Sequence, residues 1–183
     1  MNMNGIIYNQ LIENYFSKDI HKKIFDYVVG NKNILEKNKK MAFSSTYKTD
    51  EIPDFLSGFI HEKYNLYHFV GIQTLKGAHI APHIDAEVHD YMKKKDPLFI
   101  IGYPEVIVYY ADVCEDMVGG DLITNGETIR PITNSAIVLP KNQLHEVTEV
   151  KDYKRPRTVL ICERYRIIEK YLNKIDTPIH ECG

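Results

Sequence analysis

The spacing of apolar positions divides the chain into a helical front, a strand-rich middle and a short helical tail. Helices are expected over residues 17–30 and 53–64, because apolar residues recur there at intervals of three and four. Ser17 suits the N-cap of the first helix. The segment 31–50 is rich in Lys and Asn and aperiodic, which indicates a loop. A last short helix is expected over residues 166–174.

In the middle of the chain the apolar period changes to two, the period of a strand whose two faces differ. Asn125 and Gly126 form a dipeptide that favours a two-residue hairpin turn. Short strands are expected over residues 68–73, 79–86, 106–110, 121–124, 128–130, 135–139, 144–150 and 157–162. Many short strands joined by tight turns are typical of a sandwich or jelly roll. The expected fold is therefore mainly β, in the α+β class, with flanking N-terminal helices and a short C-terminal helix.

The length of 183 residues suits a single domain, and no repeat or linker interrupts it. Within residues 1–183 we expect a helical N-terminal support (1–65), a jelly-roll core (66–163) and a C-terminal tail (164–183). A hydrophobic fraction of 44% and a charged fraction of 26% are ordinary for a globular protein with a real core.

The bulk charge argues against a nucleic-acid partner, because a net charge of −2 provides no strong basic field. No apolar run approaches the length of a membrane span, and the first residues lack the features of a signal peptide. Three cysteines, scattered and without CxxC spacing, indicate reduced thiols. A cytoplasmic protein without a membrane partner is therefore expected.

A metal site is suggested by His83 and Asp85, which share one face of the expected strand while Ile84 points into apolar packing on the other face. With His145 they supply two imidazoles and one carboxylate, the donor set of mononuclear Fe(II) oxygenases, which leaves positions open for a co-substrate and O₂. A His-x-Asp pair alone is weak, since roughly half of chains with this composition contain one by chance. The alternative for an isolated pair is a surface strand with a local hydrogen bond.

Two arginines, Arg155 and Arg157, lead into the apolar strand that ends the core. A buried guanidinium needs an anionic partner, and its planar fork matches a carboxylate such as that of a dicarboxylic co-substrate. The two share strand parity, and one of the pair is expected to be exposed. Tyr110, on the same face as Val106 and Val108, is placed to assist the arginine. The alternative is a core tyrosine satisfied by the backbone.

A series of motifs in the chain resembles the prolyl-4-hydroxylase-like branch of the Fe(II)/2-oxoglutarate-dependent dioxygenase superfamily. The motifs are PHID at 82–85, VIVYYADV at 106–113, GGDL at 119–122, AIVLP at 136–140, HEVTEV at 145–150 and RPRTVLI at 155–161. Their order and spacing agree with that family and cover about half of the chain. The resemblance implies a double-stranded β-helix, a jelly-roll barrel similar to that of cupins.

The resemblance also implies roles for individual residues. It implies that His83, Asp85 and His145 are the catalytic iron ligands, and that the reaction uses Fe(II), 2-oxoglutarate and O₂. The presence of Asp85 favours hydroxylation over halogenation, because a small residue in its place frees a halide position.

The remaining implied roles concern the co-substrate. Either Arg157 or Arg155 is implied to bind the C5 carboxylate of 2-oxoglutarate, and we favour Arg157 slightly. Tyr110 resembles the tyrosine that assists this residue, and Leu122 resembles an apolar wall of the pocket. Gln73 occupies a position that is often Tyr in the family, which places one co-substrate contact in doubt.

The expected activity is hydroxylation of an unactivated C–H bond. The chain carries no appended recognition domain, so a small-molecule substrate such as a free amino acid or metabolite is expected. A peptidyl, prolyl-type hydroxylase is the alternative within the same chemistry. A non-oxidative cupin-like metal-binding protein and a metal-free binding module are the alternatives outside it.

Overall fold

The computed structural model of the protein describes residues 7–31, 40–96, 101–173 and 175. Its strands form two antiparallel sheets, a six-stranded major sheet of order β1-β8-β5-β10-β3-β2 and a four-stranded minor sheet of order β4-β9-β6-β7. The strands are β1 (Leu11–Glu13), β2 (Lys40–Lys48), β3 (Leu66–Thr74), β4 (Ile80–His83), β5 (Glu105–Asp112), β6 (Leu122–Thr124), β7 (Glu127–Ile129), β8 (Ser135–Leu139), β9 (His145–Val147) and β10 (Arg157–Tyr165). Two facing antiparallel sheets confirm the expected mainly β fold.

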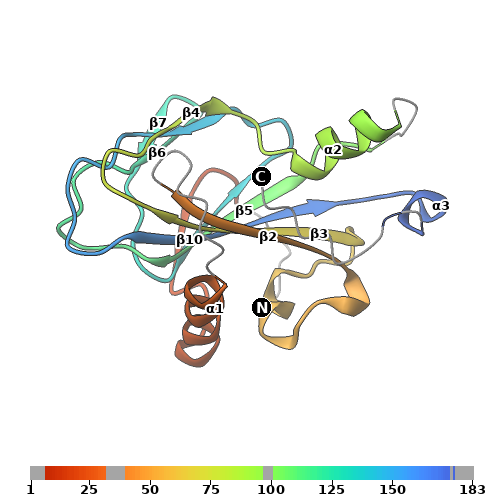
Figure 1. Cartoon of the computed structure of the whole chain (residues 1–183), viewed down its shortest axis with the longest axis horizontal. Coiled ribbons are helices and arrows are strands. Elements are labelled where there is room, and N and C mark those ends of the chain that lie inside the picture. Colours follow the sequence, from red (N-terminus) through yellow and green to blue (C-terminus); the bar gives the residue numbers. More distant parts are fainter. Residues whose placement is uncertain (1–6, 32–39, 97–100, 174, 176–183) are drawn as a thin grey trace.

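The helices are few and lie outside the two sheets (Figure 1). They are α1 (Lys18–Gly30), α2 (Glu87–Lys95) and α3 (Glu169–Leu172), with the 3₁₀ segments η2 (Thr49–Glu51) and η3 (Asp54–Phe59). The minor sheet covers one face of the major sheet, and α1 and η3 lie against the opposite face (Figure 1). None of the helices within the described residues is long and apolar enough to cross a membrane.

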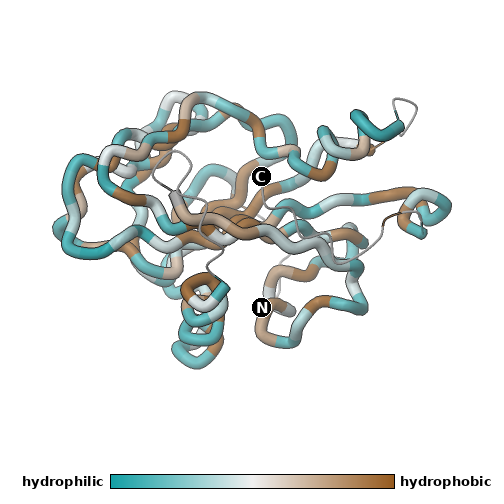
Figure 2. Tube along the Cα trace, viewed as in Figure 1, coloured by the Kyte–Doolittle hydropathy of each residue, from teal (hydrophilic) through white to brown (hydrophobic). Residues whose placement is uncertain are grey.

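The hydrophobic core has two principal layers, because both faces of the major sheet are covered. Leu122 and Val147 of the minor sheet pack against Val108 and Val159 of the major sheet in the layer between the sheets. The second layer lies under α1 and η3 and includes the fully buried Leu160. Apolar segments accordingly follow the strands, while the outer turns of α1 are hydrophilic (Figure 2).

Strand parity in β10 determines which side chains enter the space between the sheets. Arg157, Val159 and Ile161 line a cavity there. Leu160 and Cys162 face the helical layer instead. The same alternation holds in β5, as the sequence predicts for Val106, Val108 and Tyr110.

Several predicted elements are confirmed. Ser17 caps α1 by accepting a hydrogen bond from the backbone N–H of Ile20, at 3.5 Å. Asn125 and Gly126 have φ values of 52° and 77° and join β6 to β7. Positive φ at both central residues is the requirement of a type I′ hairpin turn.

The helical N-terminal support is wrong in part. The described part of the predicted loop 31–50 contains β2, which pairs with β3 at the edge of the major sheet. The predicted helix 53–64 is only the short 3₁₀ segment η3, although its stripe of Leu56 and Phe59 is buried as expected. The strand β1, which pairs with β8, was not predicted.

The chain after the metal motif also differs from expectation. The predicted strand 79–86 ends at His83, and Ile84 is 38% exposed instead of packed. The polar segment that follows is the helix α2, in which Val88 and Met92 are buried. The tail helix is one short turn, and Ile168 is exposed.

Candidate metal centre

The three predicted metal ligands meet at the edge where β4 and β9 pair. His83 is the last residue of β4 and His145 the first of β9, and the two are directly opposite each other in the antiparallel register. Asp85 follows two residues after the end of β4. A contact of two strands that are sixty residues apart in sequence therefore assembles the site.

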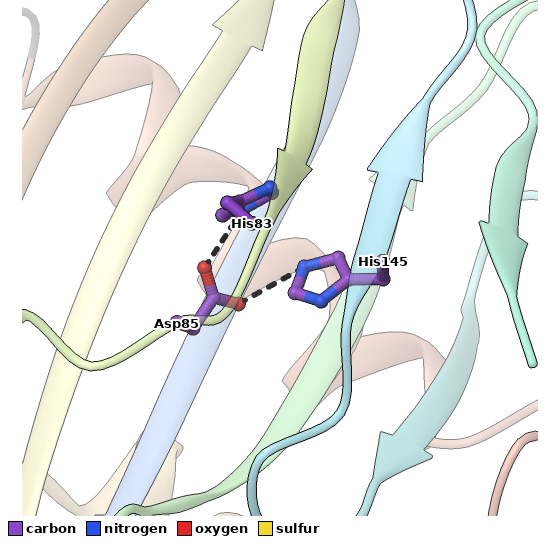
Figure 3. Close-up of side chains that lie close together, drawn as sticks. All are labelled: His83, Asp85 and His145. Atoms are coloured by element: carbon purple, nitrogen blue, oxygen red, sulfur yellow. Dashed lines mark ion pairs between the residues drawn. The ribbon is translucent and has the colours of Figure 1, made fainter.

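The three side chains converge on one point (Figure 3). Nε2 of His83 lies 3.1 Å from Oδ1 of Asp85, and Nε2 of His145 lies 3.4 Å from Oδ2 of the same carboxylate. One potential ligand atom from each residue lies within 4.8 Å of the others. The side chain of His145 is 4% exposed and that of Asp85 11%, whereas His83 at 33% faces the opening.

Backbone carbonyls set the protonation of both imidazoles. Nδ1 of His83 lies 2.9 Å from the carbonyl oxygen of Ala81, and Nδ1 of His145 lies 3.1 Å from that of Gln143. A carbonyl oxygen only accepts, so each Nδ1 carries the proton. In the neutral ring this leaves the Nε2 lone pair directed at Asp85, as metal-binding histidines require.

Two imidazole lone pairs facing one carboxylate repel each other unless a cation or protons lie between them. Oδ2 of Asp85 is buried and has no hydrogen-bond partner among the described residues. A buried polar atom without a partner is costly, and a divalent cation would satisfy it together with both nitrogens. The donor set of two neutral nitrogens and one carboxylate oxygen therefore fits a metal ion such as Fe(II).

The carboxylate is also in the protonation state that binds metal. Burial acts to raise the pKa of Asp85, but without a cation the protons between the groups reside on Nε2 of His145 and His83, and their hydrogen bonds and charge outweigh burial and hold the pKa well below its ordinary value. Asp85 is thus ionised at neutral pH. Metal ligation needs a deprotonated carboxylate, and Asp85 does not have to lose a proton before an ion binds.

A small cavity between the sheets extends from the histidines into the barrel. His83 and His145 line it together with Arg157, and its apolar walls include Leu122 and Val159. Leu122 therefore lies where an apolar wall of a co-substrate pocket is predicted.

Arg157 is a buried cation with incomplete partners. It is 3% exposed, donates from Nη1 to the carbonyl oxygen of Gly120 at 2.6 Å, and has a long contact of 3.4 Å from Nη2 to Oγ1 of Thr74. Its Nε has no hydrogen-bond partner, and within the described parts of the chain no carboxylate forms an ion pair with it. Burial lowers its pKa. A carboxylate group of a ligand is the partner that this guanidinium lacks.

Tyr110 lies beside Arg157 and is similarly incomplete. The guanidinium carbon of Arg157 is 5.9 Å from the centre of the Tyr110 ring. The phenol oxygen is buried and has no hydrogen-bond partner among the residues described. Burial raises the pKa of Tyr110 to about 12, so the phenol is a proton donor at neutral pH. The structure does not support the alternative of a tyrosine satisfied by the backbone.

The structure does not bring two other predicted co-substrate residues, Arg155 and Gln73, to the cavity that the histidines line. Arg155 precedes β10, is largely exposed, and forms a bidentate pair with Asp112 at 2.6 and 2.9 Å. Gln73 does not line the cavity, and its Nε2 donates to Oγ1 of Thr158 at 3.2 Å. Residues next to Gln73 and next to Thr158 in their strands line the cavity. Successive side chains of a strand point to opposite faces, so Gln73 points away from the cavity.

Sequence reasoning missed two residues that complete the arginine site, Thr74 and Gly120. Thr74 is opposite Arg157 in the pairing of β3 with β10, so only the register identifies it. Gly120 contributes its carbonyl oxygen, and its residue type carries no signal for that role. Its position in the GGDL motif is the one clue in the sequence.

If the cavity binds 2-oxoglutarate, as the family resemblance implies, replacing Tyr110 with phenylalanine is expected to weaken that binding about tenfold, the effect of losing about 1.5 kcal/mol from a hydrogen bond to a charged group. The free energy of unfolding should not fall, because the buried phenol oxygen has no partner in the ligand-free protein. Isothermal titration with 2-oxoglutarate and thermal unfolding measure the two effects.

The matched control is Tyr109→Phe. Tyr109 lies on the opposite face of β5, does not line the cavity, and donates to Oδ1 of Asn134 at 2.9 Å. Its replacement should lower stability and leave co-substrate affinity unchanged. Equal 2-oxoglutarate affinity in Tyr110→Phe and the unaltered protein contradicts the assigned role of Tyr110.

Comparison with known proteins identifies the fold. No family profile matches the chain, and no curated protein matches it. The structure is similar to a prolyl-4-hydroxylase from Pseudomonas putida, with a TM-score of 0.60 and 12% identity over 86% of this chain and 91% of that one. It is also similar to an oxidoreductase of the 2OG-Fe(II) oxygenase family from Burkholderia pseudomallei, with a TM-score of 0.57 and 15% identity over 86% of this chain and 87% of that one. At such identities the likeness concerns the fold, and it confirms the expected double-stranded β-helix.

Proposed function

We propose that this protein is an Fe(II)- and 2-oxoglutarate-dependent oxygenase that hydroxylates an unactivated C–H bond. The observation that carries the proposal is one cavity lined both by the histidines of the triad and by a buried arginine without a carboxylate partner. A metal-binding barrel without 2-oxoglutarate has no use for that arginine, whose burial is costly without an anion.

In this proposal His83, Asp85 and His145 hold Fe(II) and leave coordination positions open. Arg157 binds the C5 carboxylate of 2-oxoglutarate through its planar fork, and Tyr110 donates a further hydrogen bond to it. Leu122 and Val159 keep water from the co-substrate, which strengthens these polar contacts. The bound groups supply oxidative chemistry with O₂, in which 2-oxoglutarate becomes succinate and CO₂ and the substrate C–H bond becomes C–OH.

For the substrate we propose a small molecule such as a free amino acid or metabolite. The exposed edge of His83 faces the opening of the site, so a substrate reaches the metal from the solvent side of β4. A prolyl peptide is the second candidate, and the exposed apolar side chains of Ile84 and Leu144 beside the ligands favour it. The cytoplasm is the proposed location.

Anaerobic titration with Fe(II) and 2-oxoglutarate tests the proposal directly. We expect the weak visible charge-transfer band of the chelate, and succinate on admission of O₂ with a panel of free amino acids and prolyl peptides. The component of the panel that raises succinate formation identifies the substrate class. Metal binding without the band and without succinate points to a non-oxidative metal protein, and absence of metal binding points to a binding module.

A further inference from the structure

A buried polar cluster lies on the inner face of the major sheet, outside the cavity that contains Arg157. Glu163 of β10 is 1% exposed and His68 of β3 is 2% exposed, and the two are opposite each other in the strand pairing. Thr46 of β2 is opposite His68 in turn. Glu163 has the same strand parity as Arg157 and Val159, so it faces the minor sheet and the metal site.

The cluster is joined to the first residue of α2. The backbone N–H of Glu87 donates to Oε1 of Glu163 at 3.3 Å, and the Tyr165 hydroxyl donates to the other oxygen. Nε2 of His68 lies 2.9 Å from Oε2 of Glu87, and Nδ1 of His68 lies 2.7 Å from Oγ1 of Thr46. Two strands of the major sheet, β10 and β3, thus hold one residue of α2, and β2 supports His68 through Thr46.

These contacts replace a cap that α2 lacks. Its N-cap residue is Ala86, which provides no side-chain hydrogen bond to the first turn. An uncapped helix start leaves backbone N–H groups without partners, and a carboxylate at that end is favoured by the helix dipole. Glu163, which lies 76 residues after Glu87 in the chain, is therefore a cap supplied by tertiary structure.

Asp85 lies between the end of β4 and this anchor. The strand β4 ends at His83, so the ladder with β9 does not fix the backbone at Asp85. On its other side, only Ala86 separates Asp85 from the held residue Glu87. The carboxylate ligand thus lies on a short segment fixed by β4 at one end and by the cluster at the other.

We propose that Glu163 and His68 are positioning residues, which fix the carboxylate of Asp85 toward His83 and His145 by holding the start of α2. The inference rests on the proposed function, because it assigns the metal to these three residues. Groups that orient metal ligands from behind change metal affinity about 10–100-fold when they are removed. The same change is expected here, although Glu163 touches none of the three ligands in the hydrogen bonds described.

The test is Co(II) titration of the whole protein, followed by its visible ligand-field spectrum and a competition-based Kd. Glu163→Leu removes the acceptor, and we expect Co(II) affinity to fall about 10–100-fold with an altered spectrum. Glu163→Gln should restore most of the affinity, since its amide oxygen still accepts from the Glu87 N–H. Glu146→Gln is the matched control: it removes a charge next to ligand His145, on a side chain that does not line the cavity.

Tyr165→Phe keeps the test decisive if Glu163→Leu does not fold. It removes only the hydroxyl that orients Glu163, and a several-fold loss of Co(II) affinity is expected. Unchanged affinity and spectrum in the folded Glu163 and Tyr165 variants overturn the inference. Failure of the unaltered protein to bind Co(II) refutes the metal site itself. That result differs from unchanged Co(II) affinity in the variants, which refutes only the positioning role.

Discussion

Replacing Asp85 with alanine is expected to lower Fe(II) affinity by more than about 100-fold, because loss of a supporting group alone costs about 10–100-fold. Asp85 is the one anionic ligand of the proposed triad, and its carboxylate lies 3.1 and 3.4 Å from the two Nε2 atoms. Without it, two neutral imidazoles remain, which bind a hard divalent ion weakly. Turnover of 2-oxoglutarate to succinate should be lost with the metal.

The measurement is a metal titration of Asp85→Ala, with succinate formation assayed at saturating Fe(II). Asp152→Ala is the control, because it removes an exposed carboxylate that pairs with Lys76 at 3.1 Å on the surface. The control should retain metal affinity and turnover. Normal iron affinity together with retained 2-oxoglutarate turnover in Asp85→Ala would mean that the triad is wrongly assigned.

Replacing Arg157 with methionine is expected to remove 2-oxoglutarate binding while Fe(II) affinity is retained. Truncating one partner of a buried charge pair costs about 2–5 kcal/mol, or about 30-fold to several thousandfold in affinity. The stability of the ligand-free protein should move in the other direction. The guanidinium of Arg157 is buried without a carboxylate partner, so an apolar side chain of similar length should leave the free energy of unfolding equal or higher.

Arg155→Met separates the two arginines that share strand parity. Arg155 is largely exposed and pairs with Asp112, so its loss should cost at most about 1 kcal/mol of stability and leave 2-oxoglutarate affinity unchanged. Titration of both variants with 2-oxoglutarate in the presence of Fe(II), and their thermal unfolding, measure the contrast. Loss of co-substrate binding in Arg155→Met with retention in Arg157→Met reverses the assignment.

The local pattern of the sequence was sufficient for the parts of the fold that depend on near neighbours. Ser17 begins α1, and Asn125 with Gly126 turns β6 into β7, because caps and type I′ turns are decided by a few adjacent residues. Alternation in β5 predicted that Tyr110 shares a face with Val108. Such predictions hold where one period dominates and the side chains themselves determine the backbone.

Local pattern failed where pairing or burial on two faces decides the structure. β2 has the mixed sequence KMAFSSTYK after a Lys- and Asn-rich stretch, and it is a strand because it pairs with β3 at an edge of the sheet. Gln73 lies in a strand buried on both faces, so alternation cannot say which face is inward. The helix α2 has few apolar residues, and its N-cap residue Ala86 provides no side-chain cap, so the sequence carries no helical signal at its beginning.

The sequence by itself determined the donor types of the proposed metal centre, His83, Asp85 and His145, because residue identity and ordered motifs are local properties. Only the tertiary structure decided that these donors meet, since β4 and β9 must pair for His83 to face His145. It also decided that Arg157, within the β10 ladder, is buried while Arg155, two residues before it, reaches solvent. Burial depends on what packs against a residue, and a strand's own sequence does not contain its neighbours.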